Sequence, residues 1–149
     1  MTNNDLQNHL NHAVYGTPQL KPDEQRKYLG TFRERVDLVL TFGQLSTPEY
    51  LTALAQETKL HPEYVLLVNA AIPNKILAKI LKLAQDNHIQ VTTTSNVSFG
   101  TQNDDSAIIL AAKKQALNLE IIDIAKRYPL NNSSVTDTTQ KSFWHRFFN

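Results

Sequence analysis

The chain has 149 residues, of which 15 are Lys or Arg and 14 are Asp or Glu, and it contains no cysteine. Its length suits one domain with an appendage, and the lack of cysteine excludes disulfides, thiol nucleophiles and cysteine-bound metals. The near balance of charge argues against strong non-specific binding of nucleic acid, which depends on many phosphate contacts.

The N-terminal residues MTNNDLQNHL are polar and lack the basic and then apolar pattern that marks a signal peptide. No apolar run in the sequence approaches the roughly 20 residues that a membrane-spanning helix needs. We therefore expect a soluble, cytoplasmic protein.

The first part of the chain predicts three helices and one strand. Apolar residues at helical spacing indicate a helix at 4–14, and a proline followed by two acids indicates a second helix that begins at Pro22 and ends at Gly30. The apolar run VDLVL at 36–40 predicts a strand, and Thr47 is the expected N-cap of the next helix.

The next predicted elements alternate between strands and helices. The apolar run at 64–68 predicts a strand that is buried on both faces. Ile72 and Pro73 then open a helix, which Asn87 is expected to end in a left-handed conformation. The β-branched but polar run VTTT at 91–94 predicts a strand at a sheet edge.

The last predicted elements are an apolar strand at 106–112, which we expect nearer the centre of the sheet, and a helix at 118–128. The order of strands and helices implies a mixed sheet with helices packed on it. The composition changes after Pro129. We assign residues 1–130 to one α/β domain, 131–140 to a disordered polar linker and 141–149 to an aromatic, basic C-terminal peptide.

The C-terminal peptide, KSFWHRFFN, holds four of the chain's aromatic residues. In a helix these would form one stripe beside a cation, and the residues expected to dock are Phe143, Trp144, Arg146, Phe147 and Phe148. Such a short helix is marginal by itself in water. We expect the peptide to dock either on its own domain or on a protein partner, with a membrane surface less favoured because few cations accompany the aromatic residues.

The fragment VYGTPQLKPDEQRKYLGTFRERV, followed by YVLLVN and then by DSAIILAA, resembles the YueI-like proteins of low-GC Gram-positive bacteria. The resemblance covers residues 14–119 and implies a fold more than an activity. That fold is the small α/β class shared with Bacillus-type chorismate mutases and the L7Ae/L30e RNA-binding proteins. It has a four-stranded mixed sheet of order 1-4-2-3 in which strand 4 is antiparallel.

The fold relatives do not transfer their activities to this sequence. The loop at 42–49, FGQLSTPE, has the glycine but lacks the Asn-Glu pair of the kink-turn RNA-binding signature. The active-site residues of the chorismate mutases match no positions here, and the cysteine found in those sites is absent.

Two arginines in the stretch YLGTFRERV are the first candidates for a binding site. On an extended chain Arg33 and Arg35 would point to the same side, where two guanidiniums can hold a phosphate or carboxylate. Gly30 and Thr31 could add backbone and hydroxyl donors. We favour the alternative that both arginines pair with nearby acids such as Asp37 and hold the entrance to the first strand.

Two other sets of polar residues lie at helical spacing. The first set comprises Lys75, Lys79 and Lys82, which could contact RNA phosphates. Charge on the outer face of an amphipathic helix is, however, expected without any ligand. The second set comprises Asp5, His9 and His12, whose spacing is one that metal ligands use. We favour the interpretation that these residues form a solvated polar face. His61 and His88 are interpreted as caps of helix C-termini.

No catalytic motif or glycine-rich phosphate loop is present in the sequence. We therefore assign no catalytic residue, cofactor or metal. The sequence favours a non-enzymatic cytoplasmic binding module for a protein or a small anionic ligand. The first alternative is a protein that binds structured RNA, and the second is an oligomeric enzyme with a site between subunits.

Overall fold

The structure is a computed structural model, and it describes residues 22–130. Its elements, in chain order, are α2 (Pro22–Lys27), the 3₁₀ helix η1 (Arg33–Arg35), β1 (Val36–Thr41), the 3₁₀ helix η2 (Phe42–Ser46), α3 (Pro48–Leu60), β2 (Val65–Asn69), α4 (Asn74–Asn87), β3 (Gln90–Thr94), β4 (Ser106–Ala111) and α5 (Ile124–Arg127). Among these residues no helix has the length and apolar character needed to cross a membrane.

The four strands form one mixed sheet of order β1-β4-β2-β3. Strand β4 is antiparallel to both of its neighbours, whereas β2 and β3 are parallel. Every residue of β4 is buried, while β3 lies at an edge and is only partly buried. The structure thus confirms the α/β class, the strand order, the central position of β4 and the edge position of β3.

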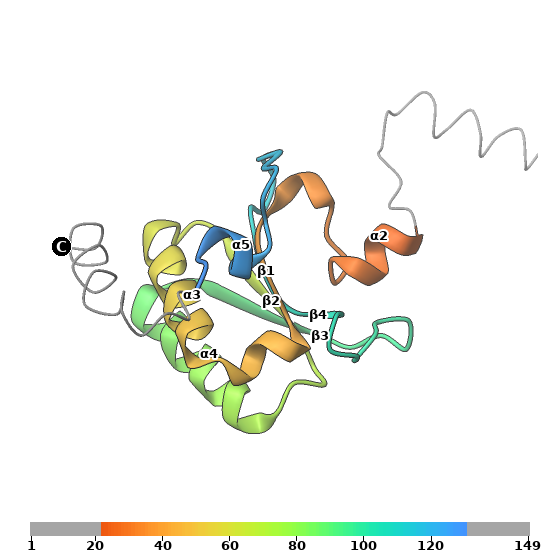
Figure 1. The fold of residues 1–149 in the computed structure, drawn as a ribbon. Coiled ribbons are helices and arrows are strands. Elements are labelled where there is room, and N and C mark those ends of the chain that lie inside the picture. The colour runs from red at the N-terminus through yellow and green to blue at the C-terminus, as the bar shows by residue number, and fades with distance from the viewer. Residues whose placement is uncertain (1–21, 131–149) are drawn as a thin grey trace, which may run out of the picture.

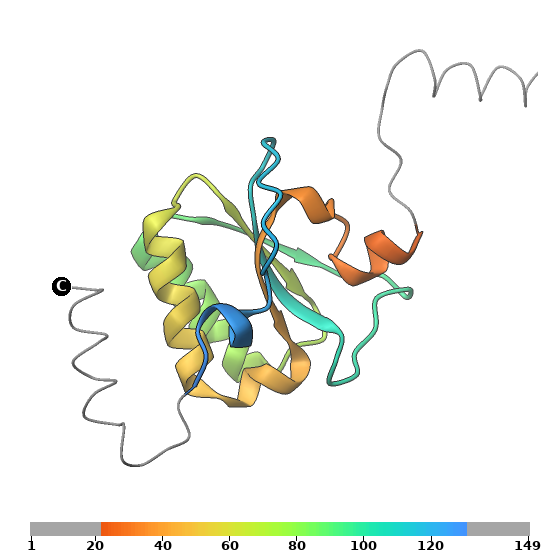
Figure 2. The ribbon, with the colours of Figure 1, turned by 45° about the horizontal axis from the view of Figure 1, so that its top comes forward.

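The two faces of the sheet are covered unequally (Figures 1 and 2). Helices α3 and α4 lie against one face, and the larger apolar core fills the space between, including Leu38, Leu54 and Ile80. On the other face a smaller cluster joins Tyr28 and Leu29, which follow α2, to the sheet. Because α2 is short, this second face leaves room for a cleft beside it.

Strand β1 contains an irregularity at Asp37. Val36 is opposite Ala111 and Leu38 is opposite Leu110, so Asp37 is an extra residue between them. A bulge of this kind turns the inserted side chain away from the regular alternation. The outer edge of β1 is covered in part, because the Val39 N–H donates to the carbonyl of Ile122 at 2.7 Å.

The prediction of a helix at 118–128 is wrong for its first half, because the helix observed there, α5, comprises only Ile124–Arg127. Asn118 has a left-handed φ of 52°, and its N–H donates to the carbonyl of Glu34. The next residues lie against the edge of β1, with Asp123 in a bridge to Val39. Helical periodicity was therefore present, but long-range backbone pairing took the hydrogen bonds that a helix would need.

The ends of two other helices differ in detail from expectation. His88, and not Asn87, adopts the left-handed conformation after α4, with φ 56° and ψ 39°. Thr47 occupies the N-cap of α3 as predicted, but its side chain makes no capping hydrogen bond.

We expect Leu54→Ala to lower the free energy of unfolding by about 2–5 kcal/mol, the usual range for deleting a buried leucine side chain. Leu54 is fully buried between α3 and the sheet. Leu60→Ala in the same helix is the matched control, because Leu60 is 64% exposed. Urea denaturation of the two variants measures both changes, and equal losses would contradict this assignment of the core.

Candidate functional site

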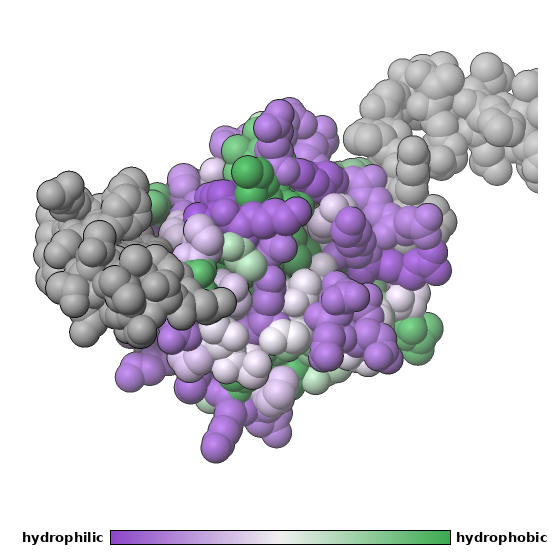
Figure 3. Space-filling model, viewed as in Figure 1, coloured by the Kyte–Doolittle hydropathy of each residue, from purple (hydrophilic) through white to green (hydrophobic). Residues whose placement is uncertain are grey.

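A polar cleft of about 620 Å³ lies beside α2, on the face of the sheet away from α3 and α4. Hydrophilic residues cover the surface over α2 (Figure 3). The cations that line the cleft are Arg26, Lys27 and Arg33. Four acids, Asp23, Asp104, Asp105 and Asp123, also line the cleft, together with Thr41 and Ser106.

Arg33 keeps part of its hydrogen-bonding capacity free in this cleft. Its Nη2 donates to the carbonyls of Leu119 and Glu120 at 2.6 and 3.3 Å. Within residues 22–130 its Nη1 and Nε have no hydrogen-bond partner. Arg26, by contrast, forms an ion pair with Asp23. Arg33 also borders a second, shallower hollow on the side of Glu34 and Asn118.

The structure separates Arg33 from the other residues of the predicted anion site. Residues Arg33–Arg35 form a 3₁₀ helix and not an extended chain, so Arg35 does not share a face with Arg33. Its guanidinium lies 4.9 Å over the Phe32 ring and donates to the carbonyl of Lys113. The backbone N–H groups of Gly30 and Thr31 already donate to Gln25 and Tyr28.

Among residues 22–130 neither Arg33 nor Arg35 forms an ion pair with an acidic side chain, so the expectation of such pairs is wrong for this part of the chain. The hydrogen bonds of both guanidiniums end on carbonyl oxygens of residues 113–120. The arginines do hold the entrance to β1, as expected, but they attach it to the segment that follows β4. The acid of this region, Glu24, instead accepts from the backbone N–H of Arg33 at 2.7 Å.

The structure does not distinguish between the alternatives for the other predicted sites. The three lysines are solvent-exposed on α4, as either an RNA-binding face or a solvated face would be; these are Lys75, Lys79 and Lys82. The predicted docking peptide at 141–149 and the helix with Asp5, His9 and His12 lie outside the described residues. Their roles stay predictions.

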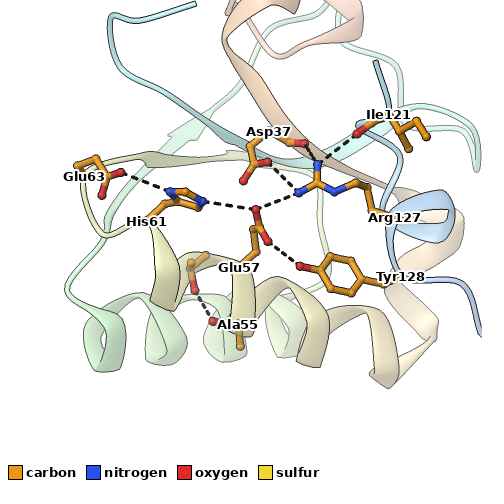
Figure 4. Close-up of polar contacts among 9 residues, drawn as sticks. Asp37, Ala55, Glu57, His61, Glu63, Ile121, Arg127 and Tyr128 are labelled. Carbon is orange, nitrogen blue, oxygen red and sulfur yellow. Dashed lines mark hydrogen bonds and ion pairs between the residues drawn. The ribbon is translucent and has the colours of Figure 1, made fainter. Parts of the chain in front are cut away.

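A buried cluster of charged side chains lies on the opposite side of β1 and was not predicted. It joins three elements that are far apart in the sequence, and its members are Asp37 of β1, Glu57 and the capping His61 of α3, Arg127 of α5 and the adjoining Tyr128 (Figure 4). Asp37 is 2% exposed and Glu57 is 5% exposed. Burial of two carboxyl groups requires that other groups compensate their charge.

Arg127 supplies most of that compensation. Its Nη2 donates to Asp37 Oδ1 at 3.1 Å and to Glu57 Oε2 at 3.0 Å. Its Nη1 donates to the backbone carbonyls of Asp37 and Ile121. The Tyr128 hydroxyl donates to Glu57 Oε1 at 2.6 Å. One guanidinium thereby connects β1, α3 and α5.

The two carboxyl groups have pKa values that move in opposite directions. Burial, and then the hydrogen bond and charge of Glu57, raise the pKa of Asp37 from 3.8 to about 7, although Arg127 acts to lower it. Burial also acts to raise the pKa of Glu57, but hydrogen bonds from Asp37 and Tyr128 and the charge of Arg127 hold that pKa below its usual 4.5. The pair thus retains one proton up to near-neutral pH.

His61 lies at the solvent side of this cluster. Its Nε2 is 3.7 Å from Glu57 Oε2, and its Nδ1 is 3.4 Å from Glu63 Oε1. The imidazole stacks on the Tyr64 ring, with the ring centroids 4.4 Å apart. The prediction that His61 caps a helix C-terminus is confirmed in position, but its side chain faces two acids.

Comparison with known proteins places the chain in a family. Residues 3–123 match the family described as "Protein of unknown function (DUF1694)". The chain belongs to this family. A curated relative of this DUF1694 protein is the uncharacterised protein YueI of Bacillus subtilis (strain 168), which is 29% identical over 124 residues. That alignment covers 83% of this chain and 91% of the relative.

A solved structure agrees with this membership. The crystal structure of YueI from Bacillus subtilis superposes on this DUF1694 chain with a TM-score of 0.62 at 28% identity. The match covers 85% of this chain and 99% of the other. The YueI-like resemblance that the sequence indicated is therefore confirmed.

Sequence signals for the buried cluster existed in this DUF1694 chain. Asp37 interrupts an otherwise apolar strand, and a buried acid in such a strand needs a partner. Glu57 and His61 are four residues apart on one helix, so they share a face. No local pattern connects either feature to Arg127, which is 90 residues from Asp37 in the sequence.

Proposed function

We propose that this protein is a binding module whose cleft beside α2 takes a small anionic ligand. The observation that carries the proposal is the unoccupied hydrogen-bonding capacity of Arg33 at the wall of that cleft, where Lys27 adds a second cation. A guanidinium presents a planar set of donors that matches a carboxylate or phosphate. The volume of about 620 Å³ is in the usual range for small-molecule sites.

The acids of the cleft narrow the chemistry of the ligand. Asp104, Asp105 and Asp123 would repel a highly charged anion. The same carboxylates accept hydrogen bonds, as do Thr41 and Ser106 at the wall of the cleft. A ligand with one anionic group and several hydroxyl or ammonium donors therefore fits best, such as a hydroxy acid, an amino acid or a sugar phosphate.

A panel of four probes tests this proposal by calorimetric titration of the full chain. The probes are inorganic phosphate, a hexose phosphate, a small hydroxy acid and an amino acid. We expect at least one to bind, and we expect Arg33→Gln to weaken that binding at least tenfold, about 1.4 kcal/mol. The reason is that the substitution removes the charge that faces the ligand.

Two further variants separate binding from folding. Arg33 also holds the carbonyls of Leu119 and Glu120, so Arg33→Gln is expected to lower the melting temperature as well. Lys27→Gln removes an exposed cation of the cleft with little effect on folding. Lys79→Gln, on exposed α4, is the control. If no probe binds, or if all three variants bind alike, the proposal is wrong.

A further inference from the structure

Three side chains of the buried cluster are arranged as a metal ion would need them. The ligand atoms that Asp37, Glu57 and His61 offer all lie within 4.8 Å of one another. Around a tetrahedral Zn²⁺ with bonds of about 2.0–2.2 Å, ligand atoms are about 3.4 Å apart. Small side-chain rotations would therefore bring all three atoms into coordination distance.

One buried oxygen of the cluster, Oδ2 of Asp37, has no hydrogen-bond partner among the described residues. Asp37 is 2% exposed, and among the described residues no N–H or O–H group donates to its Oδ2. The Asp37 carboxyl group lies toward Glu57 and His61 (Figure 4). A buried acceptor without a donor costs free energy, and either a cation or a bound proton would remove that cost.

His61 is held as a metal-binding histidine is held. Metal-ligating histidines usually donate their other ring N–H to a carboxylate or carbonyl, which fixes the ring and its tautomer. Here Nδ1 is 3.4 Å from Glu63 Oε1, and this leaves Nε2 directed at Glu57. Stacking on Tyr64 at an interplanar angle of 4° restricts the ring further. The side chain is 33% exposed, so an ion can reach it from solvent.

Arg127 and Tyr128 support the two carboxyl groups from the side away from His61 (Figure 4). They donate to Asp37 Oδ1 and to both Glu57 oxygens. Outer hydrogen bonds of this kind orient carboxylate ligands in metal sites. A divalent cation bound here would displace the proton that the carboxyl pair retains and supply positive charge in its place.

We propose that Asp37, Glu57 and His61 bind a divalent transition-metal ion of the Zn²⁺ type. Two carboxylates and one imidazole are a ligand set that suits Zn²⁺. Three protein ligands would leave a fourth coordination position open. The site is separate from the cleft beside α2, so neither proposal depends on the other.

Titration of the metal-free full chain with Zn²⁺ tests this proposal. The chain is first treated with EDTA and dialysed, and binding is followed by calorimetry, with Co²⁺ absorption as a second readout of the coordination. We expect one Zn²⁺ per chain. His61→Gln is expected to weaken binding at least a hundredfold, because it removes the nitrogen ligand, which lies at a partly exposed position.

Two more variants sharpen the test. Glu63→Gln should weaken Zn²⁺ binding by roughly 10–100-fold, as loss of an outer partner does. His88→Gln is the matched control, because His88 is an exposed histidine after α4, and it should bind as the parent does. The proposal is overturned if the parent binds no Zn²⁺ stoichiometrically, which would leave a proton as the partner of Asp37. Equal binding by parent and His61→Gln overturns it as well.

Discussion

Replacing Arg127 by methionine is expected to lower the free energy of unfolding by about 3–5 kcal/mol, the cost of leaving buried charge without its partner. Methionine retains an unbranched apolar stem, so the main loss is the guanidinium. That group compensates Asp37 and Glu57 together and also donates to two backbone carbonyls. Urea denaturation at pH 7 with EDTA measures the change.

The control for this prediction is Arg26→Met. Arg26 pairs with Asp23 at the surface, where the Asp23 side chain is 93% exposed, and such pairs contribute about 0–1 kcal/mol. A second arm adds Glu57→Gln to Arg127→Met. Because a neutral amide needs no counter-charge, the double variant should lose less than the sum of the two single losses. Equal losses for Arg127→Met and Arg26→Met would contradict the structural role of the cluster.

The pH dependence of stability is expected to change sharply when Asp37 is replaced by asparagine. The pKa of Asp37 is raised in the folded chain, from 3.8 to about 7. The folded state therefore binds more protons than the unfolded state between these values, and stability must fall as pH rises through that window. A shift of this size corresponds to an upper limit on the order of 4–5 kcal/mol, at about 1.4 kcal/mol for each pKa unit.

Glu57 acts in the opposite direction at lower pH. Its pKa is held below 4.5, so its contribution is present above that value and is lost as pH falls below it. We therefore expect the stability of the metal-free parent to be greatest at about pH 4 as far as this pair is concerned, because the unfolded and folded states bind equal numbers of protons there. Stability should then decline toward pH 7.5.

Asp37→Asn should remove most of that decline, because the amide cannot ionise and still accepts from Arg127. The free energy of unfolding of parent and variant, measured in urea at half-unit pH steps with EDTA present, provides the comparison. Asp86→Asn, at an exposed position of α4, controls for the loss of one negative charge. A decline in Asp37→Asn as steep as in the parent would show that another group is responsible.

The amino-acid sequence by itself determined the elements that depend on apolar patterning. The apolar runs at 36–40, 64–68 and 106–112 form strands. Each has apolar side chains on both sides of the strand, so these side chains are removed from water only in a sheet that other elements cover. The polar run at 91–94 lies at the edge because its threonines tolerate partial exposure. The start of α4 after Pro73 also follows from local chemistry, since proline favours the beginning of a helix.

Only the tertiary structure decided where the polar side chains go. Arg33 and Arg35 bond to carbonyls about 80 residues away, and the segment before α5 pairs with β1 instead of forming a helix. The bulge at Asp37 sets that carboxyl group against Glu57 and Arg127. Apolar burial depends on local pattern and is insensitive to which partner provides the contact. A buried charge is stabilised only by a particular donor at a particular distance, and chain topology alone supplies that donor.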